Sequence, residues 1–204
     1  LNNTGNADDG KVSIEAPNAN NIYLIAKDSK LTMDKVISTG NVRLTGQEGI
    51  DIDTIIGSNI SLEGGTGDIK HVKDGRDSSI LVGLVGNDGK INANAAGNIL
   101  LRQLTDNQYN TTGKALQSNM VLGSLAAKNI TINATGDIVS GMDKILDATG
   151  NTSEVSGISY INASEKLTLN TDGSVGTDGS GLRVKNSGGV VDIDAQNDAY
   201  LEAK

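Results

Sequence analysis

Short segments in which apolar and polar residues alternate recur along the whole chain. In the stretch 128–139, Ile130 and Ile132 alternate with asparagine and threonine, and a second apolar entry at Ile138 follows Gly136. Alternation with a period of two is typical of a β-strand that buries one face. The glycine and the immediate return of apolar residues predict a corner between two short strands rather than a helix.

This pattern repeats at a regular interval. Between residues 12 and 99 the apolar segments begin 8 to 11 residues apart, and neighbouring spacings add up to about 19 residues. Because one or two small residues join consecutive segments, the chain turns a corner there without reversing. Coils of about 19 residues, stacked at ~4.8 Å in a parallel sheet, satisfy both observations. The segments begin at Val12, Ile22, Leu31, Val42, Ile50, Ile60, Ile69, Ile80, Ile91 and Ile99.

The chain is therefore predicted to be all-β and to form one domain, a parallel β-helix or β-solenoid, over residues 1–204. A β-sandwich is the alternative, because its strands recur at a similar spacing. Strand-like residues continue through 200–204, and the first residue is Leu1. These two features predict a fragment of a longer solenoid.

The core has to be built almost entirely from aliphatic side chains, because the sequence has no Phe or Trp and four Tyr. Such residues suit narrow, even layers, so Ile130 and Ile132 are expected to point inward beneath the equivalent residues of the next coil. Outward-facing asparagines are expected to stack and to hydrogen-bond along the ladder. The 26 Gly and single Pro fit many tight corners.

Three polar segments interrupt the repeat, at 70–79, 102–119 and 140–154. Each follows a similar short strand and returns to a similar apolar entry, so all three are predicted to be loop excursions on one side of the coil. Residues 117–127 have partial helical spacing, which leaves a short helix as an alternative there. Loops on a rigid scaffold are natural recognition sites, although solenoids also tolerate insertions that bind nothing. The candidate partner-binding residues are Lys70, His71, Lys73, Arg76, Arg102, Asp106, Tyr109, Lys114, Asp143 and Lys144.

Charge and composition exclude several classes of function. A net charge of −8 without a basic patch argues against binding to nucleic acid. No apolar run approaches the ~20 residues of a transmembrane helix. With no cysteine and one histidine, the chain lacks the side chains for a histidine–cysteine zinc site. The Gly-Asp stretches 64–68 and 173–179 are isolated, whereas calcium-binding repeats occur in tandem, so turns are expected there and no metal or cofactor.

Candidate catalytic groups are few. His71 lies in a polar interruption between two lysines, and we expect a solvated loop residue. Asp51 and Asp53, like Asp192 and Asp194, are spaced so that both carboxylates point to one strand face, about 7 Å apart. Such pairs can serve glycoside hydrolysis, which makes a polysaccharide-acting β-helix enzyme the alternative function. No Trp or Phe is present to stack on a sugar, so a solvated outer face without catalytic residues is the preferred interpretation.

The stretches 40–46, 59–64 and 129–136 resemble the repeats of filamentous-haemagglutinin-like exoproteins of two-partner secretion. That family includes large adhesins, contact-dependent inhibition proteins and leukotoxin-type toxins. The resemblance implies a right-handed parallel β-helix that a partner transporter exports across a Gram-negative outer membrane. Autotransporter passengers and other β-helical surface proteins share this composition. The repeats define a scaffold, so no functional residue is carried over.

The leading functional hypothesis is a non-enzymatic structural and display segment of a secreted or surface-exposed bacterial adhesin or toxin. Its partner would be a host-cell receptor, a glycan or a matrix protein, bound through the loops. Because the core layers supply the stability, shortening the loops is expected to leave thermal unfolding nearly unchanged.

Overall fold

The computed structural model describes residues 21–86, 89–106, 110–141, 160–185 and 189–203, together with the backbone of the strands at 12–16, 144–146 and 152–154. The described residues form strands and turns without a helix, and hence no helix that could cross a membrane. The strands are β1 (Val12–Ala16), β2 (Asn21–Ala26), β3 (Leu31–Ser38), β4 (Asn41–Gly46), β5 (Ile50–Gly57), β6 (Asn59–Glu63), β7 (Ile69–Lys73), β8 (Arg76–Ser78), β9 (Ile80–Leu84), β10 (Lys90–Asn94), β11 (Asn98–Gln103), β12 (Met120–Ala134), β13 (Ile138–Ser140), β14 (Lys144–Leu146), β15 (Thr152–Glu154), β16 (Ile161–Thr171), β17 (Leu182–Val184), β18 (Val190–Ala195) and β19 (Leu201–Ala203).

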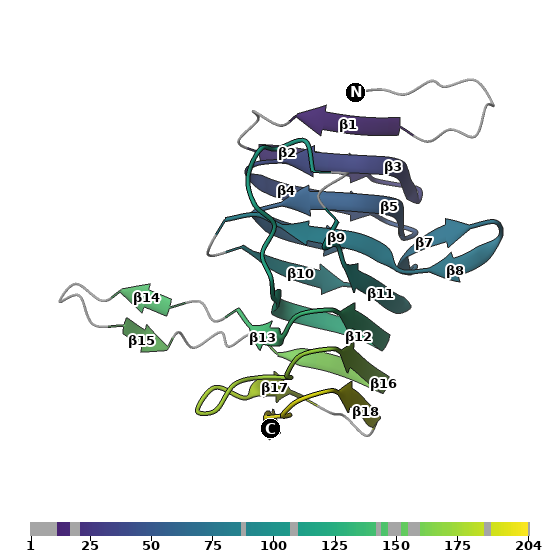
Figure 1. Ribbon diagram of the computed structural model, residues 1–204. Helices are drawn as coiled ribbons and strands as arrows, with labels where there is room; N and C mark the ends of the chain where they lie inside the picture. Colours follow the sequence, from purple (N-terminus) through teal and green to yellow (C-terminus); the bar gives the residue numbers. More distant parts are fainter. Residues whose placement is uncertain are drawn as a thin grey trace.

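Most strands pair in parallel with a strand from the next turn of the chain. On one face β1, β3, β5 and β9 follow one another, and β11, β12, β16 and β18 continue the series. On another face β2, β4, β6 and β10 do the same. Figure 1 shows the resulting pile of strands, with the N-terminal turns in purple at one end and the C-terminal turns in yellow at the other. The prediction of an all-β chain is confirmed, and the sheet is mostly parallel. The sandwich alternative is wrong, because sandwiches are built from antiparallel pairs.

A continuous ladder of aliphatic side chains runs through the centre of the pile. Its five middle members are at most 1% exposed. Ile132, beside this ladder, is also fully buried, so the predicted inward direction of Ile130 and Ile132 is confirmed. Paired residues lie 19 positions apart between β3 and β5, but 31 and 37 positions apart at the turns that carry the second and third insertions. In order, the ladder is Leu31, Ile50, Ile69, Ile99, Ile130, Leu167 and Val191.

Outward-facing asparagines connect neighbouring turns, as the sequence predicted. The side-chain amide of one asparagine donates to the amide oxygen of the asparagine one turn earlier, at 2.9 Å in each of three pairs: Asn59 to Asn41, Asn129 to Asn98 and Asn170 to Asn133. Each such bond contributes about 0.5–1.5 kcal/mol net to stability. The ladders therefore reinforce the register that the aliphatic core sets.

The first insertion, 70–79, is a β-hairpin formed by β7 and β8. Ile69 pairs with Ile99 and Ile80 pairs with Leu101, so the whole insertion occupies the place of one residue on the next turn. β7 and β8 pair with each other in antiparallel fashion. Figure 1 shows this hairpin projecting away from the pile of strands.

The insertions do not leave the pile on one side, contrary to the sequence prediction. The segment 140–154 follows β13, which stacks on the start of β12 at Met120–Leu122. The hairpin at 70–79 leaves instead from the face that carries Ile69. Figure 1 accordingly shows β7–β8 and β14–β15 on opposite sides. The strands that flank the insertions are alike in sequence, but the register assigns them to different positions in the turn.

The second insertion, 102–119, contains a segment that packs against the outside of the pile. We call its residues 104–106 and 110–117 the strap. The strap completes an apolar patch that is separate from the central ladder. Its Leu104 belongs to the patch, and its Leu116 packs against the patch. A Cβ at Gly83 would lie 2.9 Å from Leu116 Cδ2, so the glycine permits this close approach. The patch consists of Ile37, Ile56, Val85 and Leu104, each at most 4% exposed.

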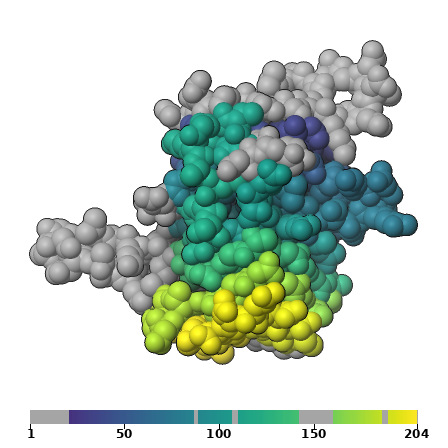
Figure 2. Space-filling model, in the orientation of Figure 1, coloured from purple at the N-terminus to yellow at the C-terminus, as the bar shows by residue number. Residues whose placement is uncertain are grey.

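Both ends of the strap are hydrogen-bonded to β9. The amide of Leu104 donates to Val82 O at 2.8 Å, and the amide of Gln117 donates to Leu84 O at 2.7 Å. In Figure 1 the strap runs up over the N-terminal turns and back, and in Figure 2 its teal atoms lie at the surface of that part of the molecule. The chain then enters β12, so the helix considered for 117–127 is not formed.

Candidate functional site

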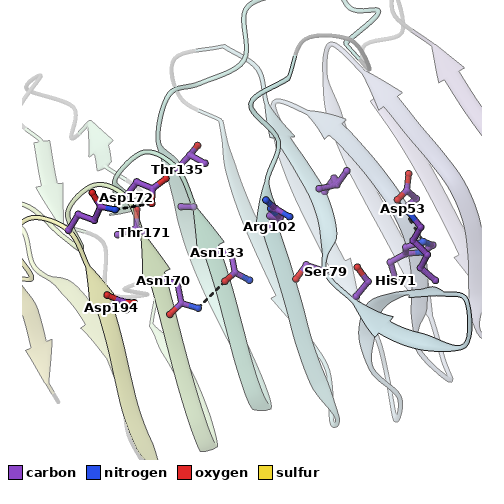
Figure 3. A pocket seen from close by; sticks show the side chains of 15 residues that line it. Asp53, His71, Ser79, Arg102, Asn133, Thr135, Asn170, Thr171, Asp172 and Asp194 are labelled. Atoms are coloured by element: carbon purple, nitrogen blue, oxygen red, sulfur yellow. Dashed lines mark hydrogen bonds and ion pairs between the residues drawn. The ribbon is translucent and has the colours of Figure 1, made fainter.

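An open groove with a volume of about 630 Å³ runs over the outer face of the sheet. Figure 3 shows its side chains, from Asp53 and His71 at one end to Asp194 at the other. With ~4.8 Å between neighbouring strands, the four steps of its central ladder span about 19 Å. This ladder of outward positions is paired turn by turn in the order Leu81, Arg102, Asn133, Asn170 and Asp194.

The part of the groove formed by β12, β16 and β18 is lined by amide, hydroxyl and carboxylate groups. The hydroxyl of Thr171 is turned to the protein, where it donates to Gly136 O. Gln196 Nε2 donates to Asp172 Oδ1 at 3.5 Å. Asp194 makes no hydrogen bond or ion pair with another described residue and is exposed. This end of the groove therefore presents acceptors to the solvent.

His71 is buried at the other end of the groove, and its ring lies between two carboxylates. The residue is 5% exposed. Its Nδ1 lies 3.1 Å from Asp51 Oδ1, and its Nε2 lies 3.7 Å from Asp53 Oδ1. The amide of Val72 donates to the same Asp51 oxygen at 2.9 Å. These contacts fasten the base of the hairpin to β5.

Two sequence predictions are wrong at this cluster. His71 is a buried residue of β7 rather than a solvated loop residue, and Asp51 is 8% exposed rather than part of a solvated face. The cause is the strand register. Asp51 of β5 pairs with Lys70 of β7, so His71, the residue after Lys70, lies beside β5 of the preceding turn. Polar groups are tolerated in buried positions when they hydrogen-bond to one another, as these do. Asp51 is therefore engaged within the protein.

Lys70 fastens the hairpin with two further ion pairs. Its Nζ lies 2.6 Å from Asp68 Oδ2 and 2.9 Å from Asp77 Oδ2. The hydrogen bond to Asp68 raises the pKa of Lys70 above its ordinary value. Burial alone would raise the pKa of Asp68, but hydrogen bonds from Lys70 and from the amide of Asn98 outweigh it and hold that pKa below its ordinary value. Lys70, a candidate for partner binding, is thus engaged in ion pairs that hold the hairpin.

Lys73 and Arg102 are the candidate residues that the structure places with His71 around the groove. Both are exposed, and the side chain of neither makes a hydrogen bond or ion pair with another described residue. Arg102 lies on β11 in the middle of the groove, between Ser79 and Asn133 in Figure 3. The free guanidinium is available to a ligand.

The other candidates lie away from the groove or outside the described side chains. Arg76 is exposed on β8, and Asp106 and Lys114 are exposed on the strap. Tyr109 and Asp143 lie outside the described residues. Of Lys144, only the backbone in β14 is described.

Apart from Asp194, sequence reasoning missed the half of the groove built by β12, β16 and β18. Asn133 and Asn170 end the similar runs Thr-Ile-Asn and Thr-Leu-Asn, which begin at Thr131 and Thr168. Superposing these repeats would have placed the two amides one above the other. The continuation to Asp194 requires the register, because β18 departs from the pattern in sequence.

The described residues include no group of three or more His, Asp or Glu side chains arranged to hold a metal ion. The groove offers hydrogen-bond donors and acceptors in a row, and a cationic and an anionic end. Such a surface can bind a polar ligand along the axis of the pile. No protein-family model, curated protein or solved structure matches the chain.

Proposed function

We propose that the chain is a stretch of a right-handed parallel β-helix that serves as a structural and display segment of a secreted or surface-exposed bacterial adhesin or toxin. The observation that carries the proposal is the difference between the inward and the outward side chains of each strand. Inward positions carry aliphatic residues from β3 to β18, while the outward ladder in the groove runs Leu81, Arg102, Asn133, Asn170 and Asp194 and so changes at most turns.

This arrangement suits display because the core, and not the surface, supplies most of the stability. In a pile of turns each level contacts only its neighbours, and stability is a sum of similar layers. Exposed side chains such as those of Lys73 and Arg102 can then differ with little cost to the fold. A host-cell receptor, glycan or matrix protein would contact these surfaces, and a transporter in the outer membrane would export the parent protein.

The test is attachment of beads coated with the purified protein to cultured cells and to surfaces coated with matrix proteins. We expect attachment to fall severalfold in a groove variant, Arg102→Ala with Asn170→Ala, or in a hairpin variant, Lys73→Ala with Arg76→Ala. Arg43→Ala, which removes an exposed cation from β4, is the matched control and should leave attachment unchanged. Wild-type beads that attach no better than albumin-coated beads would contradict the proposal.

One observation favours the alternative of a polysaccharide-acting enzyme. Asp53 lines the groove with its carboxylate 3.7 Å from His71 Nε2, so a proton-transfer pair lies at the edge of a possible substrate site. Incubation with acidic and neutral polysaccharides, followed by measurement of released reducing ends, tests this function. Turnover that is lost in Asp53→Asn would establish the enzyme and refute a purely structural role.

A further inference from the structure

The charges along the groove are sorted by position. Lys73 and Arg102, with His71 and Asp53, line the part that belongs to β5, β7 and β11. Asn133 of β12 and Asn170 of β16 follow, and Asp172, directly after β16, and Asp194 of β18 line the far part. A ligand that lies along the axis therefore first meets the exposed cations, beside which the carboxylate of Asp53 lies near His71, and then the amides and the carboxylates of Asp172 and Asp194.

The lining is suited to hydroxyl groups rather than to a peptide. β11, β12 and β16 each pair with strands on both sides, so a peptide strand cannot be added beside them under the groove, while β18 pairs with β16 alone among the described strands. Only Leu81 and Ala134 are apolar among the lining residues, and Phe, Trp and Tyr are missing from them, so the groove has no apolar pocket for a peptide side chain and would hold a sugar by hydrogen bonds rather than by stacking. Amides in a row can donate to and accept from the hydroxyls of a sugar chain, and carboxylates can accept from them.

We propose that the groove binds a linear oligosaccharide of mostly neutral sugars, lying along the axis of the pile, with one carboxylated sugar at the Arg102 and Lys73 end. This inference rests on the proposed display function and names the chemistry of its partner. The guanidinium of Arg102, which has no partner among the described residues, is suited to a bidentate bond with a carboxylate. The carboxylates of Asp172 and Asp194 would repel further negative charge, so the rest of the chain has to be uncharged.

The experiment compares two fluorescent probes: a linear N-acetyllactosamine oligosaccharide that ends in sialic acid, and the same chain without sialic acid. Binding to the full chain is followed by fluorescence anisotropy at low salt. We expect the sialylated probe to bind about tenfold or more tightly than the neutral one, as one charge-assisted bidentate contact provides. Added salt should reduce this difference.

Three variants assign the contacts. Arg102→Gln should remove the difference between the probes, while Asn170→Ala should weaken both probes by a similar factor. Arg43→Gln, on another face, should change neither. Arg102 is exposed and has no partner among the described residues, so its variant is expected to fold, and circular dichroism checks this.

Equal binding of the two probes to the wild type, or a difference that persists in Arg102→Gln, would overturn the inference. So would the absence of binding by either probe, or the finding that an acidic Glu-rich peptide binds through Arg102 while both oligosaccharides fail. If the beads of the previous section still attach to cells in those cases, the display function stands and the glycan assignment alone is wrong.

Discussion

The strap provides the sharpest test of how this chain is stabilised. Leu104 is 4% exposed and belongs to the patch with Ile37, Ile56 and Val85, whereas Leu116 is partly buried against it. Truncation of a buried leucine to alanine costs about 2–5 kcal/mol, and a partly buried one costs less. We therefore expect the double variant, Leu104→Ala with Leu116→Ala, to lose about 3 kcal/mol, a large part of the 5–15 kcal/mol typical of a domain.

The assay is equilibrium unfolding in urea, followed by far-ultraviolet circular dichroism. Because stacked turns can unfold in parts, hydrogen exchange of the amides of Ile37 and Ile56 should be measured as well. Exchange at these amides should accelerate if the strap protects them. Leu201→Ala is the matched control, since Leu201 is 42% exposed, and it should cost no more than about 0.5 kcal/mol.

A free loop would give a different result. Two substitutions on a loop that packs against nothing would together cost no more than about 1 kcal/mol. A loss below that value, with unchanged exchange at Ile37 and Ile56, would refute the reasoning. The expectation from sequence, that this insertion can be shortened without effect on unfolding, would then be restored.

Three further predictions concern the core, the histidine cluster and pH. Ile130→Ala, in the middle of the aliphatic ladder, should lower the free energy of unfolding by about 2–5 kcal/mol in urea titrations. Asp51→Ala should lower the free energy of unfolding by about 1–3 kcal/mol, because it leaves the amide of Val72 without its acceptor. Asp51→Asn keeps an acceptor oxygen and should cost less, so equal losses in the two variants would contradict the described contacts. The pKa of Asp68 is depressed in the folded state, so the contribution of Asp68 to the free energy of unfolding should be present above pH 3.8 and be lost as the pH falls through the folded-state pKa. Asp68→Asn should flatten the acidic part of the plot of stability against pH.

Much of the fold follows from local patterns. Successive side chains of a strand point to opposite faces whatever the tertiary context, so the alternation around Ile130 and Ile132 was enough to predict which side is buried. Corner glycines and the lack of aromatic residues pointed to many short strands with aliphatic layers. The stacked asparagines also followed, because equivalent positions of neighbouring turns carry asparagine even where an insertion lengthens the turn.

The sequence by itself determined the all-β class and the inward ladder, because these depend on residues close together in the chain. Only the tertiary structure decided what each interruption does. His71 is buried because the register sets it beside Asp51, 20 positions earlier. The strap covers a patch that begins at Ile37, and the groove joins Arg102 to Asn170 through steps of 31 and 37 residues. Insertions change these separations from turn to turn, so a fixed period in the sequence cannot reveal which side chains become neighbours.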